Sequence, residues 1–249
     1  MKAIDINCDM GESFGRFSLG QDVEMMELVS TINIACGFHA GDPLVIETTV
    51  ANAIRYGVAI GAHPSYPDLQ GFGRRAMDLT PEEIEAMVLY QIGAVSGFVK
   101  AAGSNLNHVK PHGALYNQAA SSPLLARAVC RAVKRFSKEL ILVGLAGSEL
   151  IEIGFEEGLR VVAEGFPERG YNSDGTLISR RLPGAMIEDP TEAAKNALKL
   201  ATDGIPGPDG QVWRIDTLCI HGDSEHGLEI ARSVREILLQ NGWAVQAFT

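Results

Sequence analysis

Three ionisable side chains stand at alternate positions in the segment 108–113, which reads HVKPHG. On an extended backbone, side chains two positions apart lie on one face, so His108, Lys110 and His112 would point the same way. Imidazole and ammonium groups together can transfer protons and stabilise negative charge. Pro111 disfavours a helix here, because it lacks a backbone N–H and restricts the preceding residue to extended conformations. The segment therefore predicts a strand end with a polar face turned into a site, and not a helical zinc motif.

Polar side chains also occur at the ends of other apolar runs. Asp5, Asn7 and Asp9 alternate with apolar residues in the first run, so they share one face. His39 follows the second run, and His63 follows the third. Alone, Asp9 could equally cap a turn, and its alignment with Asp5 and Asn7 favours a functional role. Because α/β folds place their sites at the carboxyl ends of strands, we expect these groups to line a cavity inside the fold.

Further charged residues follow later strand-like runs. Arg74 lies in a glycine-rich loop, and Arg169 comes shortly after Glu164. A guanidinium can hold a carboxylate or phosphate through paired N–H groups, although exposed arginines are commonly only solvated surface. His221 and Asp223 could form an imidazole oriented by an acid, or a turn followed by a helix cap. These positions extend the expected site to groups that bind substrate.

The elements that must position these residues alternate along the chain, as in parallel βα units. Strands are expected near residues 2–8, 31–37, 58–62, 106–110, 140–144, 160–164, 216–221 and 243–247, and helices near 21–29, 44–56, 81–102, 113–136, 147–157, 190–203 and 224–240. Seven or eight such units predict a closed or nearly closed (β/α) barrel of the TIM type. A doubly wound open sheet is the main alternative, but its strands would be apolar on both faces.

Length and composition restrict the class of protein. The chain has 249 residues, 46% of them hydrophobic, and no linker divides it, so we expect a single (β/α) barrel domain over residues 1–249. A formal net charge of −10 argues against a nucleic-acid partner. The apolar stretch 86–99 is too short to cross a bilayer and contains Gln91, and the N-terminus reaches an acid too soon for a signal peptide. We therefore expect no membrane partner and a cytoplasmic location, which four scattered cysteines also suit.

The sequence contains neither a P-loop nor a dinucleotide-binding motif. A metal held by Asp9, His39, His63 or His112 is chemically feasible, because such ligands with open positions activate water. The chain shows no compact ligand motif for it, so no bound metal is firmly predicted.

Five blocks of the sequence resemble the lactam-utilisation family, whose members are regarded as the A component of prokaryotic 5-oxoprolinase. The blocks are DINCDMGE at 5–12, NIACGFHAGD at 33–42, GAHPSYPD at 61–68, HVKPHGALYN at 108–117 and HGD at 221–223. They follow the family's order over nearly the whole chain. The sequence departs from the pattern at Cys8 and Met10, where the family often has small or aliphatic residues.

The resemblance implies a distorted TIM-like barrel related to carbohydrate deacetylases. It also implies ATP-dependent hydrolysis of the lactam of 5-oxo-L-proline to L-glutamate, with ATP and magnesium as co-substrate and with two partners, the 5-oxoprolinase subunits B and C. An unstrained lactam resists water, so phosphorylation of its amide oxygen would create a leaving group and an electrophilic carbon. Acids and imidazoles could then manage the proton transfers.

The residues suggest a division of roles within this chemistry. We hypothesise that Asp9 and His112 act as acid and base, that Lys110 stabilises charge on the activated oxygen, and that His39 and His63 orient substrate or water. The expected substrate-binding residues, with an arginine for the substrate carboxylate, are Asp5, Asn7, Arg74, Glu164, Arg169, His221 and Asp223.

Two other functions fit the same sequence. A metal-dependent deacetylase or amidohydrolase acting alone would explain the acids and histidines inside a barrel. A non-catalytic protein that presents 5-oxoproline to a partner would explain the missing P-loop, with ATP bound on the partner.

Overall fold

The computed structural model describes residues 2–178, 182–222 and 226–248. Parallel strands form a closed ring of β1 (Lys2–Met10), β2 (Thr31–Ala35), β3 (Ala59–His63), β4 (His108–Val109), β5 (Ile141–Leu145), β6 (Arg160–Gly165) and β9 (Thr217–Ile220). The ring closes because β9 pairs with both β6 and β1. An eighth strand, β10 (Trp243–Val245), pairs with the start of β1. The expected barrel of seven to eight strands is confirmed, and the open sheet is excluded.

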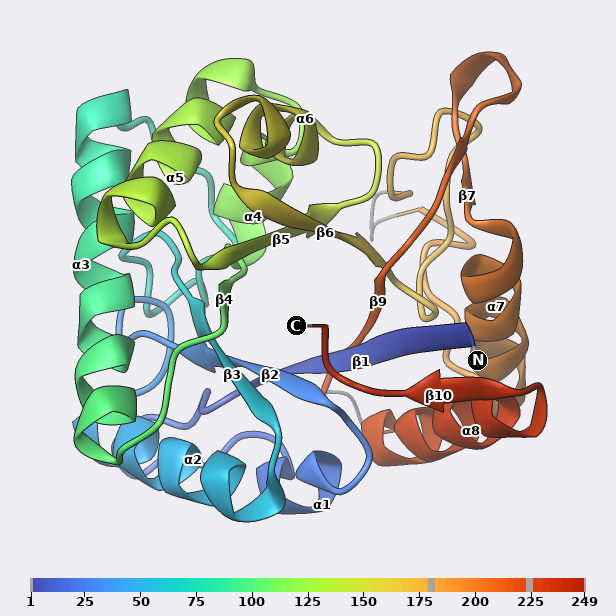
Figure 1. The fold of residues 1–249 in the computed structure, drawn as a ribbon, viewed down its shortest axis with the longest axis horizontal. Coiled ribbons are helices and arrows are strands. Elements are labelled where there is room, and N and C mark those ends of the chain that lie inside the picture. Colours follow the sequence, from blue (N-terminus) through green and yellow to red (C-terminus); the bar gives the residue numbers. More distant parts are fainter. Residues whose placement is uncertain (1, 179–181, 223–225, 249) are drawn as a thin grey trace.

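Helices surround this ring (Figure 1). They are α1 (Asp22–Met26), α2 (Pro43–Tyr56), α3 (Pro81–Ala101), α4 (Gly113–Ala119), α5 (Pro123–Phe136), α6 (Glu149–Glu156), α7 (Pro190–Asp203) and α8 (Gly227–Gln240). Four of them begin with a proline behind a side-chain cap, namely Asp42, Thr80, Ser122 and Asp189. A proline at the first helical position lacks a backbone N–H that would have no partner within the helix. The cap side chain accepts a hydrogen bond from another N–H of the first turn.

Two details differ from the sequence expectation. The single helix expected over 113–136 is wrong, because Ser122 is extended and Pro123 starts a new helix. Proline disfavours helical conformation in the residue before it, so the first helix ends at Ala119. A short antiparallel pair, β7 (Ile205–Pro206) and β8 (Val212–Trp213), was not expected. Strands of two residues are too short to show an alternating pattern.

Helix α3 is the one helix among the described residues that is long and apolar enough, by length and composition, to cross a membrane. The sequence prediction that the apolar stretch 86–99 is too short to cross a bilayer is therefore wrong on length, because the helix around it has 21 residues. In the structure α3 packs on the barrel through fully buried residues such as Ile84, Val88 and Ile92. Its buried Gln91 exchanges hydrogen bonds with the backbone of Ser65. The helix therefore serves as a wall of the protein core.

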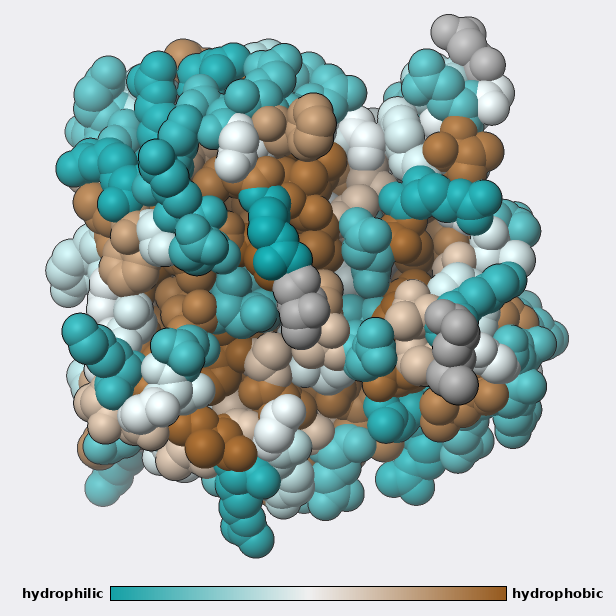
Figure 2. Space-filling model, in the orientation of Figure 1, coloured by the Kyte–Doolittle hydropathy of each residue, from teal (hydrophilic) through white to brown (hydrophobic). Residues whose placement is uncertain are grey.

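The C-terminal tail closes one end of the barrel, where the mark C lies inside the ring in Figure 1. Phe248 packs against Ile141, Val143 and Val162, and its ring lies 5.1 Å from that of His108. Figure 2 shows this view with polar residues mainly around the rim and apolar residues nearer the centre. This end of the barrel is therefore filled by side chains.

The polar residues that lie inside the barrel next to this filled end pack tightly as well. His108 is fully buried and lies 2.8 Å from the amide oxygen of Asn33, and a side chain at Gly61 would overlap its ring. Asp5 accepts hydrogen bonds from Ser30 at 2.6 Å, from Thr31 at 2.9 Å and from Thr217. The expectation of a cavity along the inside of the barrel is therefore wrong at this level. The side chains turn inward as predicted, but Asp5 and His108 are packed among their neighbours.

Burial raises the pKa of Asp5 from 3.8 to about 6, although its three hydroxyl donors oppose the shift. The folded protein therefore binds a proton on Asp5 more tightly than the unfolded chain does. This binding contributes fully to the free energy of unfolding below about pH 4, and the contribution is lost as the pH rises through 6. The difference corresponds to about 3 kcal/mol. We expect the stability advantage of the parent over Asp5→Asn, measured by urea unfolding, to fall by about this amount between pH 4 and pH 7. An advantage that is constant or grows with pH would contradict the assignment.

Candidate active site

A cavity of about 240 Å³ opens at the carboxyl ends of the strands. Its walls come from the ends of β1, β3 and β4 and from the loops that follow β3, β6 and β9. Among its lining residues are the acids Asp9 and Glu12, the imidazoles of His63, His112 and His221, the cations Arg74, Lys110 and Arg169, and the rings of Phe72, Tyr116 and Phe166. The cavity therefore collects most of the groups that could do chemistry in this chain.

Lys110 lies at the centre of a buried network. Its Nζ is 3.1 Å from Asp9 Oδ1, 2.9 Å from Glu164 Oε1 and 3.1 Å from Asn7 Oδ1. Burial opposes the charge of this lysine, but the neighbouring Asp9, Cys219 and Glu164 together outweigh burial and raise its pKa well above the ordinary value. Lys110 therefore presents a fixed positive charge at the cavity wall.

Asp9 links Lys110 to the imidazoles. Its Oδ1 accepts hydrogen bonds from Lys110 and from Asn33 Nδ2 at 2.9 Å, and its Oδ2 lies 3.2 Å from His63 Nε2. Burial raises the pKa of Asp9, but His63 and Lys110 outweigh burial and hold it well below the ordinary value. The carboxylate is therefore ionised at neutral pH, and its partly exposed edge faces the cavity.

Backbone carbonyls orient two of the histidines. His63 Nδ1 lies 2.7 Å from the carbonyl oxygen of Lys110, and His112 Nε2 lies 2.8 Å from that of Phe72. A carbonyl oxygen can only accept, so these two nitrogens carry the ring protons. The remaining nitrogens, His63 Nε2 and His112 Nδ1, face each other at 3.0 Å, so they either share one proton or meet as two lone pairs.

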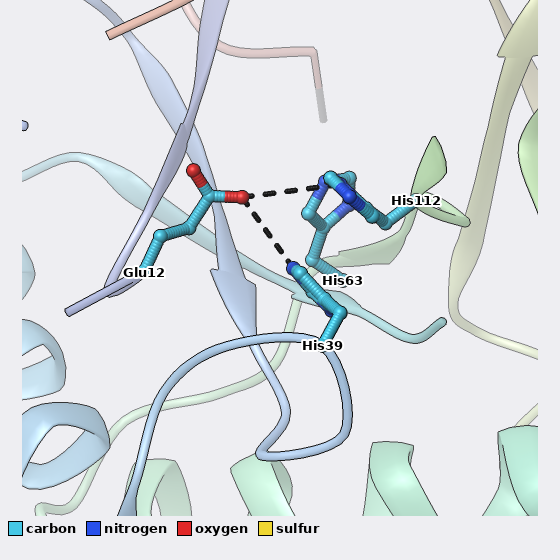
Figure 3. Close-up of side chains that lie close together, drawn as sticks. All are labelled: Glu12, His39, His63 and His112. Carbon is cyan, nitrogen blue, oxygen red and sulfur yellow. Dashed lines mark hydrogen bonds and ion pairs between the residues drawn. The ribbon is translucent and has the colours of Figure 1, made fainter. Parts of the chain in front are cut away.

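Glu12 and His39 complete this cluster (Figure 3). Glu12 Oε1 lies 3.4 Å from His39 Nε2 and 3.8 Å from His112 Nδ1, and the rings of His39 and His112 stack at 3.9 Å. Burial lowers the pKa of His39 well below the ordinary value and that of His112 to about 3, so both rings are neutral. Four donor atoms from these residues and His63 lie within 4.8 Å of one another, so the cluster could hold a metal ion.

Glu12 was not selected from the sequence. The available signal was its place three residues after Asp9, at the end of the first strand. Tyr116 was missed too; its hydroxyl donates to Glu164 Oε2 at 2.8 Å, and its ring borders the cavity. An aromatic residue on an apolar helix face gives no sequence signal that separates such a role from core packing.

Several residues expected to bind substrate lie away from the cavity surface. Asn7 and Glu164 are fully buried behind Lys110 and are joined by a hydrogen bond of 2.9 Å. Asp5 lies deeper still, among the hydroxyls of Ser30 and Thr217. In this structure these residues orient the groups that border the cavity.

The two candidate arginines differ in their surroundings. Arg169 is buried, and its guanidinium donates to the carbonyl oxygens of Ala185 at 3.1 Å and Ile178 at 2.6 Å. These two hydrogen bonds stabilise the loop after β6. Arg74 is exposed at the cavity rim, with its guanidinium 5.0 Å from the centre of the Phe72 ring. Arg74 is therefore better placed to hold a carboxylate that enters the cavity.

His221 has an acidic neighbour from another part of the chain. Its backbone N–H donates to Glu168 Oε2 at 2.9 Å, and its Nδ1 lies 3.0 Å from the same atom. Asp223, the acid expected from the sequence, lies outside the described residues. Among the residues that the structure describes, Glu168 in the loop after β6 supplies a carboxylate within reach of His221.

Gly73 brings the backbone against the histidine cluster. At its φ of +64° an added Cβ would overlap Ser65 Oγ and lie 2.9 Å from atoms of His39 and His112. We expect Gly73→Ala to lower the free energy of unfolding by at least about 2 kcal/mol, because a left-handed backbone and an overfilled site are both costly. Gly97→Ala, exposed on α3 with open space around its Cβ, should instead stabilise the protein by about 0.5–1 kcal/mol. Equal effects of the two substitutions in urea unfolding would contradict this account.

A closed parallel barrel with acids, imidazoles and a lysine at its mouth defines the class of TIM-like barrels that place a site at the carboxyl ends of the strands. Within that class the chain belongs to the LamB/YcsF family, whose model matches residues 4–249. The resemblance seen in the sequence is thereby confirmed.

Known relatives agree over the full length. The chain is 53% identical to the 5-oxoprolinase A component of Heliobacterium modesticaldum, over 98% of this chain and 97% of the relative. It is 52% identical to the lactam utilization protein from Thermus thermophilus, whose crystal structure it matches over 100% of both chains with a TM-score of 0.93. The catalytic domain of peptidoglycan N-acetylglucosamine deacetylase from Eubacterium rectale is 11% identical, with a TM-score of 0.50 over 100% of this chain and 89% of that one. That likeness shows a shared fold, as expected for a deacetylase-type barrel.

Proposed function

We propose that this protein is component A of an ATP-dependent 5-oxoprolinase, which hydrolyses 5-oxo-L-proline to L-glutamate together with subunits B and C. Sequence identity of 50–53% over nearly the full length to proteins named as the A component of 5-oxoprolinase supports the assignment. The structural observation that carries it is the buried pair of Asp9 and Lys110, which places an ionised acid and a fixed positive charge side by side at one small cavity.

The size of the cavity favours a small substrate. At about 240 Å³ it lies below the roughly 300–1,000 Å³ that is typical of sites for drug-sized ligands. A five-membered lactam acid suits this volume, whereas a whole nucleotide does not. We therefore assign the lactam to the cavity and its carboxylate to Arg74, with ATP and magnesium at the mouth or on a partner protein.

The groups around the cavity suit hydrolysis of an activated lactam. Transfer of the terminal phosphoryl group of ATP to the lactam oxygen makes the ring carbon electrophilic. The Lys110 ammonium stabilises the negative charge on that oxygen, and the Asp9 carboxylate accepts a proton from the attacking water. The C–N bond of the ring then breaks, and the nitrogen takes up the proton that Asp9 accepted. A second water hydrolyses the resulting acyl phosphate, which gives the side-chain carboxylate of glutamate and inorganic phosphate. Asp9 keeps a partly exposed carboxylate edge at the cavity, whereas both ring nitrogens of His112 face protein atoms, so we assign the proton transfer to Asp9 and not to His112.

The test is ATP-dependent glutamate release from 5-oxo-L-proline by this chain alone, by subunits B and C alone, and by the mixture. We expect release only from the mixture, with ATP hydrolysed in step. Full release by B and C without this chain would refute the proposal, and so would the absence of release from a folded, associated mixture.

The cluster of Glu12 with three histidines favours a second candidate, a metal-dependent amidohydrolase or deacetylase that acts alone. This candidate predicts hydrolysis of a simple amide or N-acetyl sugar by the metal-loaded chain without ATP or partners. Hydrolysis by the mixture that requires ATP would exclude it as the main activity.

We also propose a cytoplasmic location, since ATP and magnesium are supplied there. The net charge of −10 suits a soluble protein. Cell fractionation followed by immunodetection tests this directly, and recovery in the membrane or the medium would contradict it.

A further inference from the structure

Two imidazoles of the histidine cluster turn their inner nitrogens toward each other. Backbone carbonyls of Lys110 and Phe72 hold the ring protons of His63 and His112 on their outer nitrogens. Their inner nitrogens are 3.0 Å apart, and the Asp9 carboxylate lies 3.2 Å from one of them. Two lone pairs and a carboxylate in such contact repel one another unless a cation lies between them.

A proton on His63 could provide part of this positive charge. It would bridge His63 Nε2 to His112 or to Asp9. Such a proton would not provide a partner for His39, however. This ring is fully buried, and neither of its nitrogens makes a hydrogen bond to the residues that the structure describes, although Glu12 Oε1 lies 3.4 Å from Nε2. Buried polar atoms are nearly always paired, because an unpaired one forfeits its hydration without compensation. His39 therefore points to a further ligand inside the cluster.

We propose that Glu12, His39, His63 and His112 together bind one divalent transition-metal ion, for which Zn²⁺ is the best fit. Three imidazoles and a carboxylate are donors that Zn²⁺ prefers, whereas Mg²⁺ and Ca²⁺ prefer oxygen ligands throughout. The ligand atoms are His39 Nε2, His63 Nε2, His112 Nδ1 and Glu12 Oε1.

The distances suit such an ion. With zinc–ligand bonds of about 2.0 Å, tetrahedral ligand atoms lie roughly 3.3 Å apart. The observed separations are 3.0 Å between His63 and His112, 3.4 Å between Glu12 and His39, and 3.8 Å between Glu12 and His112, and all four ligand atoms lie within 4.8 Å of one another. Side-chain movements would bring the more distant pairs to the tetrahedral spacing. Metal-ligating histidines commonly donate their other N–H to a backbone carbonyl, as His63 and His112 do.

The site adjoins the cavity, because Glu12, His63 and His112 all belong to its lining. An ion there would act as a Lewis acid beside any bound substrate. The metal site does not depend on the proposed reaction, since the donor atoms alone define it.

Titration of the chelator-treated, folded full-length chain with ZnCl₂ in a calorimeter tests the proposal. We expect one ion per chain, and Co²⁺ in its place should develop the visible absorption of a nitrogen–oxygen site. His39→Gln and Glu12→Gln should each weaken Zn²⁺ binding by at least about 10-fold. His226→Gln, at an exposed histidine before α8, serves as the matched control and should retain the affinity of the parent.

Three results would overturn the proposal: no stoichiometric Zn²⁺ binding by the folded parent, equal affinity in the parent and in Glu12→Gln, or equal weakening in the His226 control. Circular dichroism checks the fold of each variant, and Glu12→Gln carries the test if His39→Gln does not fold. Because the readout is metal binding, loss of glutamate release with intact binding would concern the proposed function only.

Discussion

Replacement of Asp9 by asparagine is expected to lower kcat for 5-oxo-L-proline hydrolysis by the assembled enzyme about 10²–10⁴-fold, which is the usual contribution of a positioned acid–base group. Asparagine keeps the shape of the side chain and can still accept a hydrogen bond from Lys110, but it cannot take a proton from water. Its amide nitrogen would also face His63 Nε2, where the carboxylate now lies at 3.2 Å. Steady-state glutamate release by the mixture with subunits B and C measures the effect.

Asp189→Asn provides the matched control. Asp189 is an exposed N-cap of α7 whose side chain accepts from the Glu192 backbone N–H, and asparagine caps helices equally well. Turnover should stay within about 2-fold of the parent, since surface changes of this kind alter stability by only a few tenths of a kcal/mol. Unchanged turnover in a folded Asp9→Asn variant would instead favour a non-catalytic component that presents substrate to a partner.

Lys110→Met should affect both stability and turnover. Removal of the ammonium leaves the fully buried Glu164 carboxylate without its counter-ion, which costs about 3–5 kcal/mol. Turnover should fall at least about 10²-fold, because charge on the activated lactam oxygen is no longer stabilised. Urea unfolding and glutamate release measure the two effects separately.

The double variant Lys110→Met/Glu164→Gln separates structure from chemistry. Glutamine at position 164 can still accept from Asn7 or Tyr116. Of the two carboxylates that lose Lys110, the double variant neutralises the fully buried Glu164, while Asp9 keeps its hydrogen bond from Asn33. We expect it to recover most of the lost stability, a coupling that a double-mutant cycle detects, and to recover no turnover. Recovery of turnover together with stability would show that Lys110 has only a structural role.

Local patterns in the chain were sufficient for the barrel and for its inward faces. Alternation placed Asp5, Asn7 and Asp9 on one side of β1, and the same rule turned His108 and Lys110 inward, as observed. Strand pleating has a period of two, and helix caps involve neighbours three residues apart, so both can be read from short windows. The split between α4 and α5 was missed because the signal of Ser122 and Pro123 was outweighed by the apolar pattern around them.

Contacts between distant segments could not be read in this way. One partner of His221 is Glu168, 53 positions away, and the guanidinium of Arg169 donates hydrogen bonds to loop carbonyls. Glu12 meets His39 and His112 only because three separate strand ends converge at the barrel mouth. Which acid meets which base depends on strand register, ring closure and loop paths, and these are set by packing over the whole chain. The sequence therefore specified which side chains turn inward, whereas the closed barrel set the distances on which their chemistry depends.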